Sequence, residues 1–184
     1  MLPIPVNTIR RAEPQDIQNL SALAQKTYTD AFGFSFFPDD LTAHLQSNLS
    51  PANFAYMLAH DTILVAEADG QMIGFVHFGD AAGYVDAPTS TDGALHKLYV
   101  LAEFQNQRVG SQLMDAALAE MASQGIEAVY LDVWEHNPGA TRFYQRYGFV
   151  VIGERGFDVE SGAETSLDLI MVRRQASCRQ KQRE

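Results

Sequence analysis

The 184-residue chain has little cysteine and no long apolar run. Its one cysteine, Cys178, cannot form an internal disulfide or a zinc cage, which excludes a secreted disulfide scaffold. No apolar run approaches the roughly 18 residues that a membrane-spanning helix needs, and the N-terminal sequence lacks the pattern of a signal peptide. The length fits one domain with its own core. We therefore expect a single domain over residues 1–172, no membrane association and a cytoplasmic location.

Basic residues are scarce outside the C-terminus. The chain has 13 Lys and Arg against 23 Asp and Glu, and residues 12–96 contain one basic residue, Lys26, against 11 acidic ones. An acidic surface repels nucleic-acid phosphates and attracts small cations, so we expect no nucleic acid as a partner. The alternative is a surface charge that only keeps the protein soluble. Segment 173–184 is basic and has no apolar periodicity, which predicts a disordered tail.

The predicted elements alternate between strands and helices. Apolar periodicity and helix-starting residues predict helices that begin near positions 13, 38 and 51 and helices over 109–124 and 138–146. Runs rich in β-branched and aromatic residues predict strands over 6–12, 62–67, 72–78, 94–101, 127–134, 149–153 and 166–172. Ala68-Asp69-Gly70 is typical of a hairpin turn, and the segment Gly79–Gly93 is a predicted loop. The pattern indicates an α+β domain built on a mixed sheet.

A strand, a short turn and a helix follow one another in the segment LHKLYVLAEFQNQRVGSQLMDAAL, which starts at Leu95. The N-terminus of a helix presents backbone N–H groups and partial positive charge, which suits an anion. The nucleotide-binding patterns GxxxxGK[ST] and GxGxxG are absent from the chain, which disfavours nucleotide hydrolysis and dinucleotide binding. The turn before this helix is therefore a candidate phosphate site of another kind.

A second segment, LDVWEHNPGATRFYQRYGF, starts at Leu131. Together with the first segment it resembles the GCN5-related N-acetyltransferase (GNAT) superfamily, over roughly residues 9–172. The resemblance implies an α+β fold of the three-layer α/β type, with a mixed, mostly antiparallel sheet of six or seven strands and helices on both faces. It also implies an enzyme that moves acetyl directly from acetyl-CoA, its co-substrate, to a primary amine.

The resemblance also implies a set of cofactor-binding residues. The pyrophosphate signature falls on Gln105 to Gly110, where Arg108 replaces the first family glycine. We expect the turn still to bind the pyrophosphate, provided that φ at Arg108 is negative. Arg146 is a candidate contact to the cofactor's phosphates by its place on the predicted helix, and the alternative is a solvated helix face. The contacts that the resemblance implies are Leu98, Tyr99, Val100, Gln105, Asn106, Gln107, Arg108, Val109, Gly110, Ser111, Asn137 and Tyr144. Of these, the strand backbone at Leu98–Val100 would pair with the pantetheine arm. Tyr144 would be the general acid that protonates the departing CoA thiolate. The alternative is a structural role, in which Tyr144 only packs on the sheet.

The base that deprotonates the amine has several candidates. They are Glu67, His77, His96, Asp132 and Glu135. No set of His, Cys or Asp residues has metal-ligand spacing, so we expect no metal. Neither Ser111 nor Cys178 has the surroundings of a nucleophile.

The acceptor is predicted from charge and from a finer resemblance. The string Val133–Asn137 and the early region Tyr28–Asp40 resemble bacterial polyamine acetyltransferases, which implies spermidine or spermine as the acceptor. Within Tyr28–Asp40, aromatic residues over 32–37 are flanked by carboxylates that would suit a polycation, namely Asp30, Asp39 and Asp40. The alternatives are another small amine, a peptide N-terminus, or a non-catalytic acyl-CoA-binding module. A homodimer is compatible with each of these functions.

Overall fold

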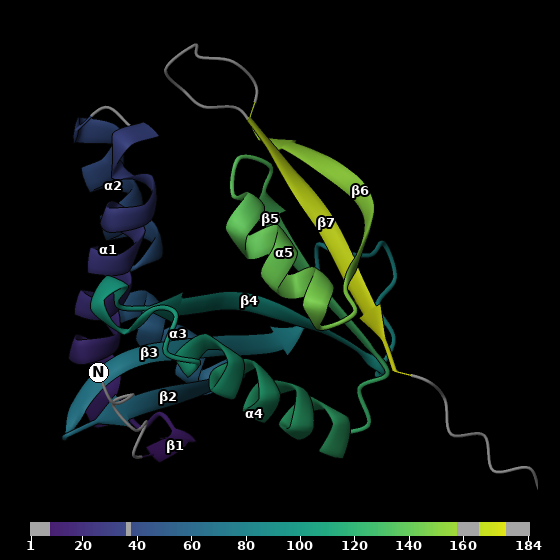
Figure 1. Ribbon diagram of the computed structural model, residues 1–184, viewed down its shortest axis with the longest axis horizontal. Coiled ribbons are helices and arrows are strands. Elements are labelled where there is room, and N and C mark those ends of the chain that lie inside the picture. Colours follow the sequence, from purple (N-terminus) through teal and green to yellow (C-terminus); the bar gives the residue numbers. More distant parts are fainter. Residues whose placement is uncertain (1–7, 36–37, 158–165, 176–184) are drawn as a thin grey trace, which may run out of the picture. The chain divides into compact units, whose positions relative to one another are not determined.

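The computed structural model describes residues 8–35, 38–157 and 166–175. These residues form a seven-stranded sheet in the order β1-β2-β3-β4-β5-β7-β6, shown in Figure 1. The strands are β1 (Thr8–Arg11), β2 (Thr62–Ala68), β3 (Gln71–Asp80), β4 (Asp92–Val100), β5 (Ala128–Trp134), β6 (Val150–Phe157) and β7 (Ser166–Arg174). The β4–β5 pair is parallel, whereas the β1–β2, β2–β3, β5–β7 and β6–β7 pairs are antiparallel. This confirms the predicted mixed, mostly antiparallel α+β fold.

The chain divides into two compact units. The first consists of Met1–Gly79 and His96–Glu120, and the second consists of Asp80–Leu95 and Met121–Glu184. The division falls within β4, so the two ends of this strand belong to different units. The expectation of a single domain stays a prediction.

The first unit contains helices and an apolar core. The helices are α1 (Ile17–Phe32), α2 (Pro38–Asn48), α3 (Pro51–His60) and the first part of α4 (Val109–Ser123). Leu20 on α1, Phe54 on α3 and Phe75 on β3 are completely buried in one cluster. The rings of Phe54 and Phe75 meet edge to face with centroids 5.6 Å apart. This packing fixes α1 and α3 on β3.

Local sequence signals set the ends of these elements. Ser50 caps α3, and its side chain accepts a hydrogen bond from the backbone N–H of Asn53 at 3.3 Å. The β2–β3 hairpin turns at Asp69 and Gly70, whose φ values are 49° and 77°. Positive φ at both central residues matches the twist of the two strands. The hairpin that the sequence predicts is thus confirmed.

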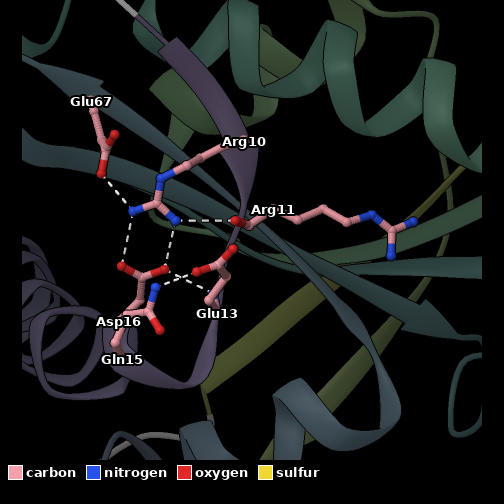
Figure 2. Close-up of polar contacts among 6 residues, drawn as sticks. All are labelled: Arg10, Arg11, Glu13, Gln15, Asp16 and Glu67. Atoms are coloured by element: carbon pink, nitrogen blue, oxygen red, sulfur yellow. Dashed lines mark hydrogen bonds and ion pairs between the residues drawn. The ribbon is translucent and has the colours of Figure 1, made fainter.

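An ion-pair cluster fastens β1 to the rest of the first unit (Figure 2). The Arg10 guanidinium donates to both carboxylate oxygens of Asp16, at 2.7 and 2.9 Å, and to Oε1 of Glu67 on β2 at 2.6 Å. The backbone N–H of Glu13 also donates to Asp16, at 2.8 Å. Asp16 is only 5% exposed, so its carboxylate depends on these donors to replace water. Hydrogen bonds and the charge of Arg10 lower the pKa of Asp16 below its ordinary value.

In the second unit, β7 is the middle strand of an antiparallel group with β5 and β6, as Figure 1 shows. Gly125, with φ 83°, ends α4 and leads into β5, in line with the C-cap expected there. Arg173 and Arg174 pair with β5, and Arg173 Nε donates to the backbone oxygen of Tyr147 at 3.0 Å. Strand β7 therefore extends two residues beyond the predicted strand 166–172. The remainder of the predicted tail, from residue 176, lies outside the described residues.

Among the residues that the structure describes, no helix combines the length and the apolar character needed to cross a membrane.

Candidate active site

The predicted pyrophosphate turn connects β4 to α4. After the 3-10 turn η3 (Ala102–Phe104), the chain runs through Gln105 and Gln107 to the start of α4 at Val109. The side-chain amide of Gln105 donates to the backbone oxygen of Val100 at 3.2 Å, and that of Gln107 donates to the backbone oxygen of Glu103 at 2.7 Å. These two bonds tie the turn to the end of β4 and to η3.

The backbone of this turn is left-handed at two residues that are not glycine. Asn106 has φ 60° and Arg108 has φ 67°. The negative φ on which the expected binding was conditional is therefore not found at Arg108. An L-residue in this conformation costs about 1–2 kcal/mol, because its Cβ approaches a carbonyl oxygen, whereas glycine adopts it freely. The position at which the resemblance places a glycine thus keeps the glycine conformation in this chain, although it carries arginine.

The turn delivers the first N–H groups of α4 to one place. The helix has 15 residues and starts at Val109, Gly110 and Ser111, with the Val109 side chain buried as an anchor. The N–H groups of a first helical turn have no carbonyl partner within the helix, and they carry the positive end of the helix dipole. This arrangement suits a phosphate or pyrophosphate.

The strand that precedes the turn is held rigidly. Leu98, Tyr99 and Val100 are half-buried at the end of β4. A Cβ on Gly74 of β3 would lie 2.8 Å from the backbone oxygen of Tyr99 and 3.2 Å from Cγ2 of Val100, so only glycine allows this close approach. The rings of Phe75 and Tyr99 meet edge to face at 5.5 Å. The backbone to which the pantetheine arm is predicted to bind is therefore fixed in place.

Tyr144 lies on α5 (Pro138–Arg146) in the second unit. Its side chain is buried, and its ring lies against Phe143 and Phe149 with centroids 5.5 and 5.9 Å away. Burial, and secondarily the charge of Asp132, raise the pKa of Tyr144 above its ordinary value. The phenol is therefore protonated at neutral pH, as a general acid must be before it acts.

The two other cofactor residues predicted on α5 lie at its ends. Asn137 caps the helix, and its side-chain oxygen accepts from the backbone N–H of Ala140 at 3.1 Å. The amide nitrogen of Asn137 is a donor of hydrogen bonds by its chemistry. Arg146 is exposed at the other end, and its guanidinium carbon lies 5.6 Å from the centre of the Phe143 ring. This contact orients the Arg146 side chain.

Two of the candidate bases in the second unit have hydrogen-bond or ionic partners. Asp132 lies 3.4 Å from the hydroxyl of Tyr84 and 3.6 Å from the Arg155 guanidinium. Glu135 accepts the backbone N–H of Leu167 at 3.1 Å. These contacts stabilise both groups as hydrogen-bond acceptors.

Asp168 on β7 is a carboxyl group that the sequence analysis missed. Burial, followed by the charge of Asp132, raises its pKa to about 6. The signal available in the sequence was an acidic residue between Leu167 and Leu169 in an apolar strand. A carboxyl group that titrates this close to neutrality belongs with the candidate acid–base groups.

Two of the carboxylates considered for the acceptor site, one as a base and one as a partner of a polycation, form ion pairs within the first unit. Glu67 binds Arg10, as described above, and Asp30 accepts from Lys26 at 2.6 Å. Asp39 and Asp40 lie in the first turn of α2, where negative charge stabilises the helix. Of the aromatic residues predicted to border the acceptor, Phe36 and Phe37 lie outside the described residues. One carboxylate oxygen of Glu67 is therefore occupied by the ion pair with Arg10.

The remaining two candidate bases, His77 and His96, lie together with Asp61. One ligand atom from each of these three side chains lies within 4.8 Å of the others. The spacing of His, Cys and Asp residues along the sequence gave no reason to expect such a cluster. The fold brings its three members together from separate elements. The sequence carried no local signal for it, because Asp61 ends α3, His77 is on β3 and His96 is on β4.

Comparisons with known proteins agree on one family. A model of the acetyltransferase (GNAT) family matches residues 18–149. An uncharacterised N-acetyltransferase of Mycobacterium tuberculosis is 33% identical over 162 residues, which cover 86% of this chain and 97% of that protein. The spermine/spermidine N(1)-acetyltransferase of Bacillus subtilis is 27% identical over 93 residues, which cover 50% of this chain and 61% of that protein.

A solved structure shares the fold. The PaiA N-acetyltransferase of Thermoplasma acidophilum, solved in complex with coenzyme A, superposes with a TM-score of 0.74. The superposition covers 91% of this chain and 98% of that chain, at 21% sequence identity. The likeness therefore extends over both compact units.

Proposed function

The chain belongs to the acetyltransferase (GNAT) family, and from this premise we propose that it transfers acetyl from acetyl-CoA directly to a primary amine. The observation that carries the proposal is the turn before α4, in which Arg108 has a left-handed backbone at the position of the family's first glycine. A coenzyme A complex of a protein with the same fold supports acetyl-CoA as the co-substrate. The fold alone does not determine the reaction, which depends on the residues of the site.

We assign the cofactor contacts within each unit separately. In the first unit, the start of α4 would hold the pyrophosphate and the backbone of Leu98–Val100 would bind the pantetheine arm as an added strand. The turn residues Asn106 and Arg108 set the direction in which the α4 N–H groups point. In the second unit, Asn137 and Arg146 are the proposed contacts on α5. An amide donor and a guanidinium suit the polar groups of coenzyme A.

In the proposed reaction, the amine nitrogen forms a bond to the acetyl carbon, and the bond from that carbon to sulfur breaks. The departing thiolate takes a proton, which we assign to the hydroxyl of Tyr144. A carboxyl group in that role would be ionised near neutral pH and would have no proton to give, whereas burial keeps Tyr144 protonated. The amine must lose its own proton before it attacks. Holding both substrates in line removes an entropic barrier of up to roughly 7–11 kcal/mol.

For the acceptor we propose a small polycationic amine such as spermidine or spermine. The net charge of −10 and the partial similarity to the Bacillus subtilis enzyme support this choice. Electrostatic attraction favours a cation but does not identify it, because most amines are protonated at pH 7. Asp30 and Glu67 are paired with basic side chains, whereas Asp39 and Asp40 form no ion pair with another described residue.

The decisive experiment measures CoA release with a panel of amines. Spermidine, spermine, an amino-acid amide and a short peptide would each be offered with acetyl-CoA. We expect the polyamines to give the highest kcat/KM, and the KM for spermidine to rise with ionic strength as charges are screened. Faster acetylation of the peptide would overturn the polyamine assignment and leave the acetyl transfer standing. Binding of CoA without release on any amine would support a non-catalytic module instead.

A further inference from the structure

The cluster of Asp61, His77 and His96 lies entirely in the first unit. Asp61 is the residue that ends α3, His77 is near the end of β3, and His96 is on β4. The rings of the two histidines have centroids 4.8 Å apart. Two imidazoles and a carboxylate from three elements therefore converge on one small volume.

His77 is buried and only partly satisfied. It is 4% exposed, and its Nε2 lies 2.8 Å from Oδ2 of Asp61. Its Nδ1 is buried and has no hydrogen-bond partner among the described residues. Histidine is the commonest metal ligand in proteins and binds through either ring nitrogen.

Gly79 determines where the Asp61 carboxylate can lie. A Cβ on Gly79 would be 2.0 Å from Oδ1 of Asp61 and 2.6 Å from its Cγ. The carboxylate thus occupies the space that any other residue at position 79 would fill. The other oxygen of this carboxylate, Oδ2, lies 2.8 Å from Nε2 of His77. The carboxylate is held toward the histidines by the backbone of β3.

We propose that Asp61, His77 and His96 form a binding site for a divalent transition metal, with Zn²⁺ the best match. Two imidazole nitrogens and one carboxylate oxygen are ligands that Zn²⁺ prefers, whereas Mg²⁺ and Ca²⁺ take oxygen alone. Ligands 2.0–2.2 Å from a tetrahedral Zn²⁺ lie about 3.3 Å from one another. The ligand atoms here span separations from 2.8 Å up to 4.8 Å, which bracket that value. Side-chain rotations of small amplitude would close the site.

The chemistry of the site follows from its three ligands. A fourth coordination position remains for water or another small ligand, as in open zinc sites. The positive charge of Lys97 lies near His77 and opposes a cation, so it lowers the affinity of the site. The proposal does not depend on acetyl transfer, because its test measures metal binding directly.

The test titrates the tag-free, chelator-treated protein with Zn²⁺ by calorimetry and with Co²⁺ by visible absorption. We expect one metal ion per chain, a tetrahedral Co²⁺ spectrum, and a melting temperature that rises with Zn²⁺ concentration. Because loss of an outer-shell partner alone costs about 10–100-fold in affinity, His96→Gln and Asp61→Asn should each lose at least that much. His136→Gln, an exposed histidine of the second unit, is the matched control and should bind as the wild type does.

His77→Gln is the third ligand variant, and its fold must be verified by circular dichroism because the side chain is buried. If it does not fold, the half-buried His96 still tests the site. The proposal is overturned if the wild type binds no Zn²⁺ at micromolar concentration. It is also overturned if His96→Gln and Asp61→Asn bind as tightly as His136→Gln. In both cases the cluster is a hydrogen-bond network only.

Discussion

Replacing Arg108 by glycine and by alanine tests the geometry of the turn before α4. The wild-type arginine has φ 67°, a conformation that costs an L-residue about 1–2 kcal/mol. Glycine removes this cost but gains about 0.4–1 kcal/mol of conformational freedom in the unfolded chain, whereas alanine keeps the strain. Arg108→Gly should therefore be more stable than Arg108→Ala by about 0.5–1 kcal/mol.

The comparison of the two variants isolates the backbone, because both lack the guanidinium and its charge. For a chain of this size the difference corresponds to a melting temperature about 1–4 °C higher for the glycine variant, measurable by differential scanning fluorimetry or calorimetry. At a residue with negative φ the order is reversed, since alanine then restricts the unfolded state at no cost in the folded one. An alanine variant that melts above the glycine variant would refute the left-handed turn.

Three further predictions concern the proposed site and the ion-pair cluster. Gly110→Glu places a carboxylate at the start of α4, so CoA affinity measured by calorimetry should fall at least about tenfold while the protein stays folded; unchanged affinity would move the pyrophosphate elsewhere. Tyr144→Phe removes only the proton donor, so kcat should fall roughly 100-fold with CoA binding retained, and an unaltered kcat with chemistry rate-limiting would assign the proton to another group. Because the pKa of Asp16 is lowered in the folded state, its stabilising effect is present above its unfolded pKa of about 3.9 and is lost as the pH falls through the folded value. Arg10→Met should therefore lower the free energy of unfolding, measured in urea, by about 2–3 kcal/mol at pH 7 and by much less at low pH. An equal loss at both pH values would contradict the ion-pair account.

The order and type of the elements could be predicted because their signals are local. Ser50-Pro51 starts α3, Asp69-Gly70 makes the hairpin turn, and Gly125 ends α4, each through a backbone preference that neighbouring residues alone determine. The ends of the strands were predicted less accurately. β7 continues through Arg174, two residues past the predicted end, because it pairs with β5 there. Pairing is a long-range interaction that a basic composition does not indicate.

The parts of the site that escaped prediction depend on contacts between distant positions. Glu67 was a candidate base by its residue type alone, and its ion pair with Arg10 arises from the register of β1 with β2. The conformation of Arg108 follows from how the chain must turn into α4, and the residue type favours the opposite sign of φ. His77 and His96 were each considered singly. Their meeting with Asp61 arises only when α3, β3 and β4 are assembled.

Local unfolding of the short strand β1 would expose the edge of β2. β1 is an edge strand of four residues and covers one backbone edge of β2, whose Leu64 and Val65 are buried. Short edge strands exchange their amide hydrogens early, and an uncovered apolar strand is a template for pairing with another molecule. Arg10 resists this opening by joining β1 to both Asp16 and Glu67. Loss of Arg10 should thus appear as faster hydrogen exchange in β1 and β2 and as aggregation at protein concentrations that the wild type tolerates.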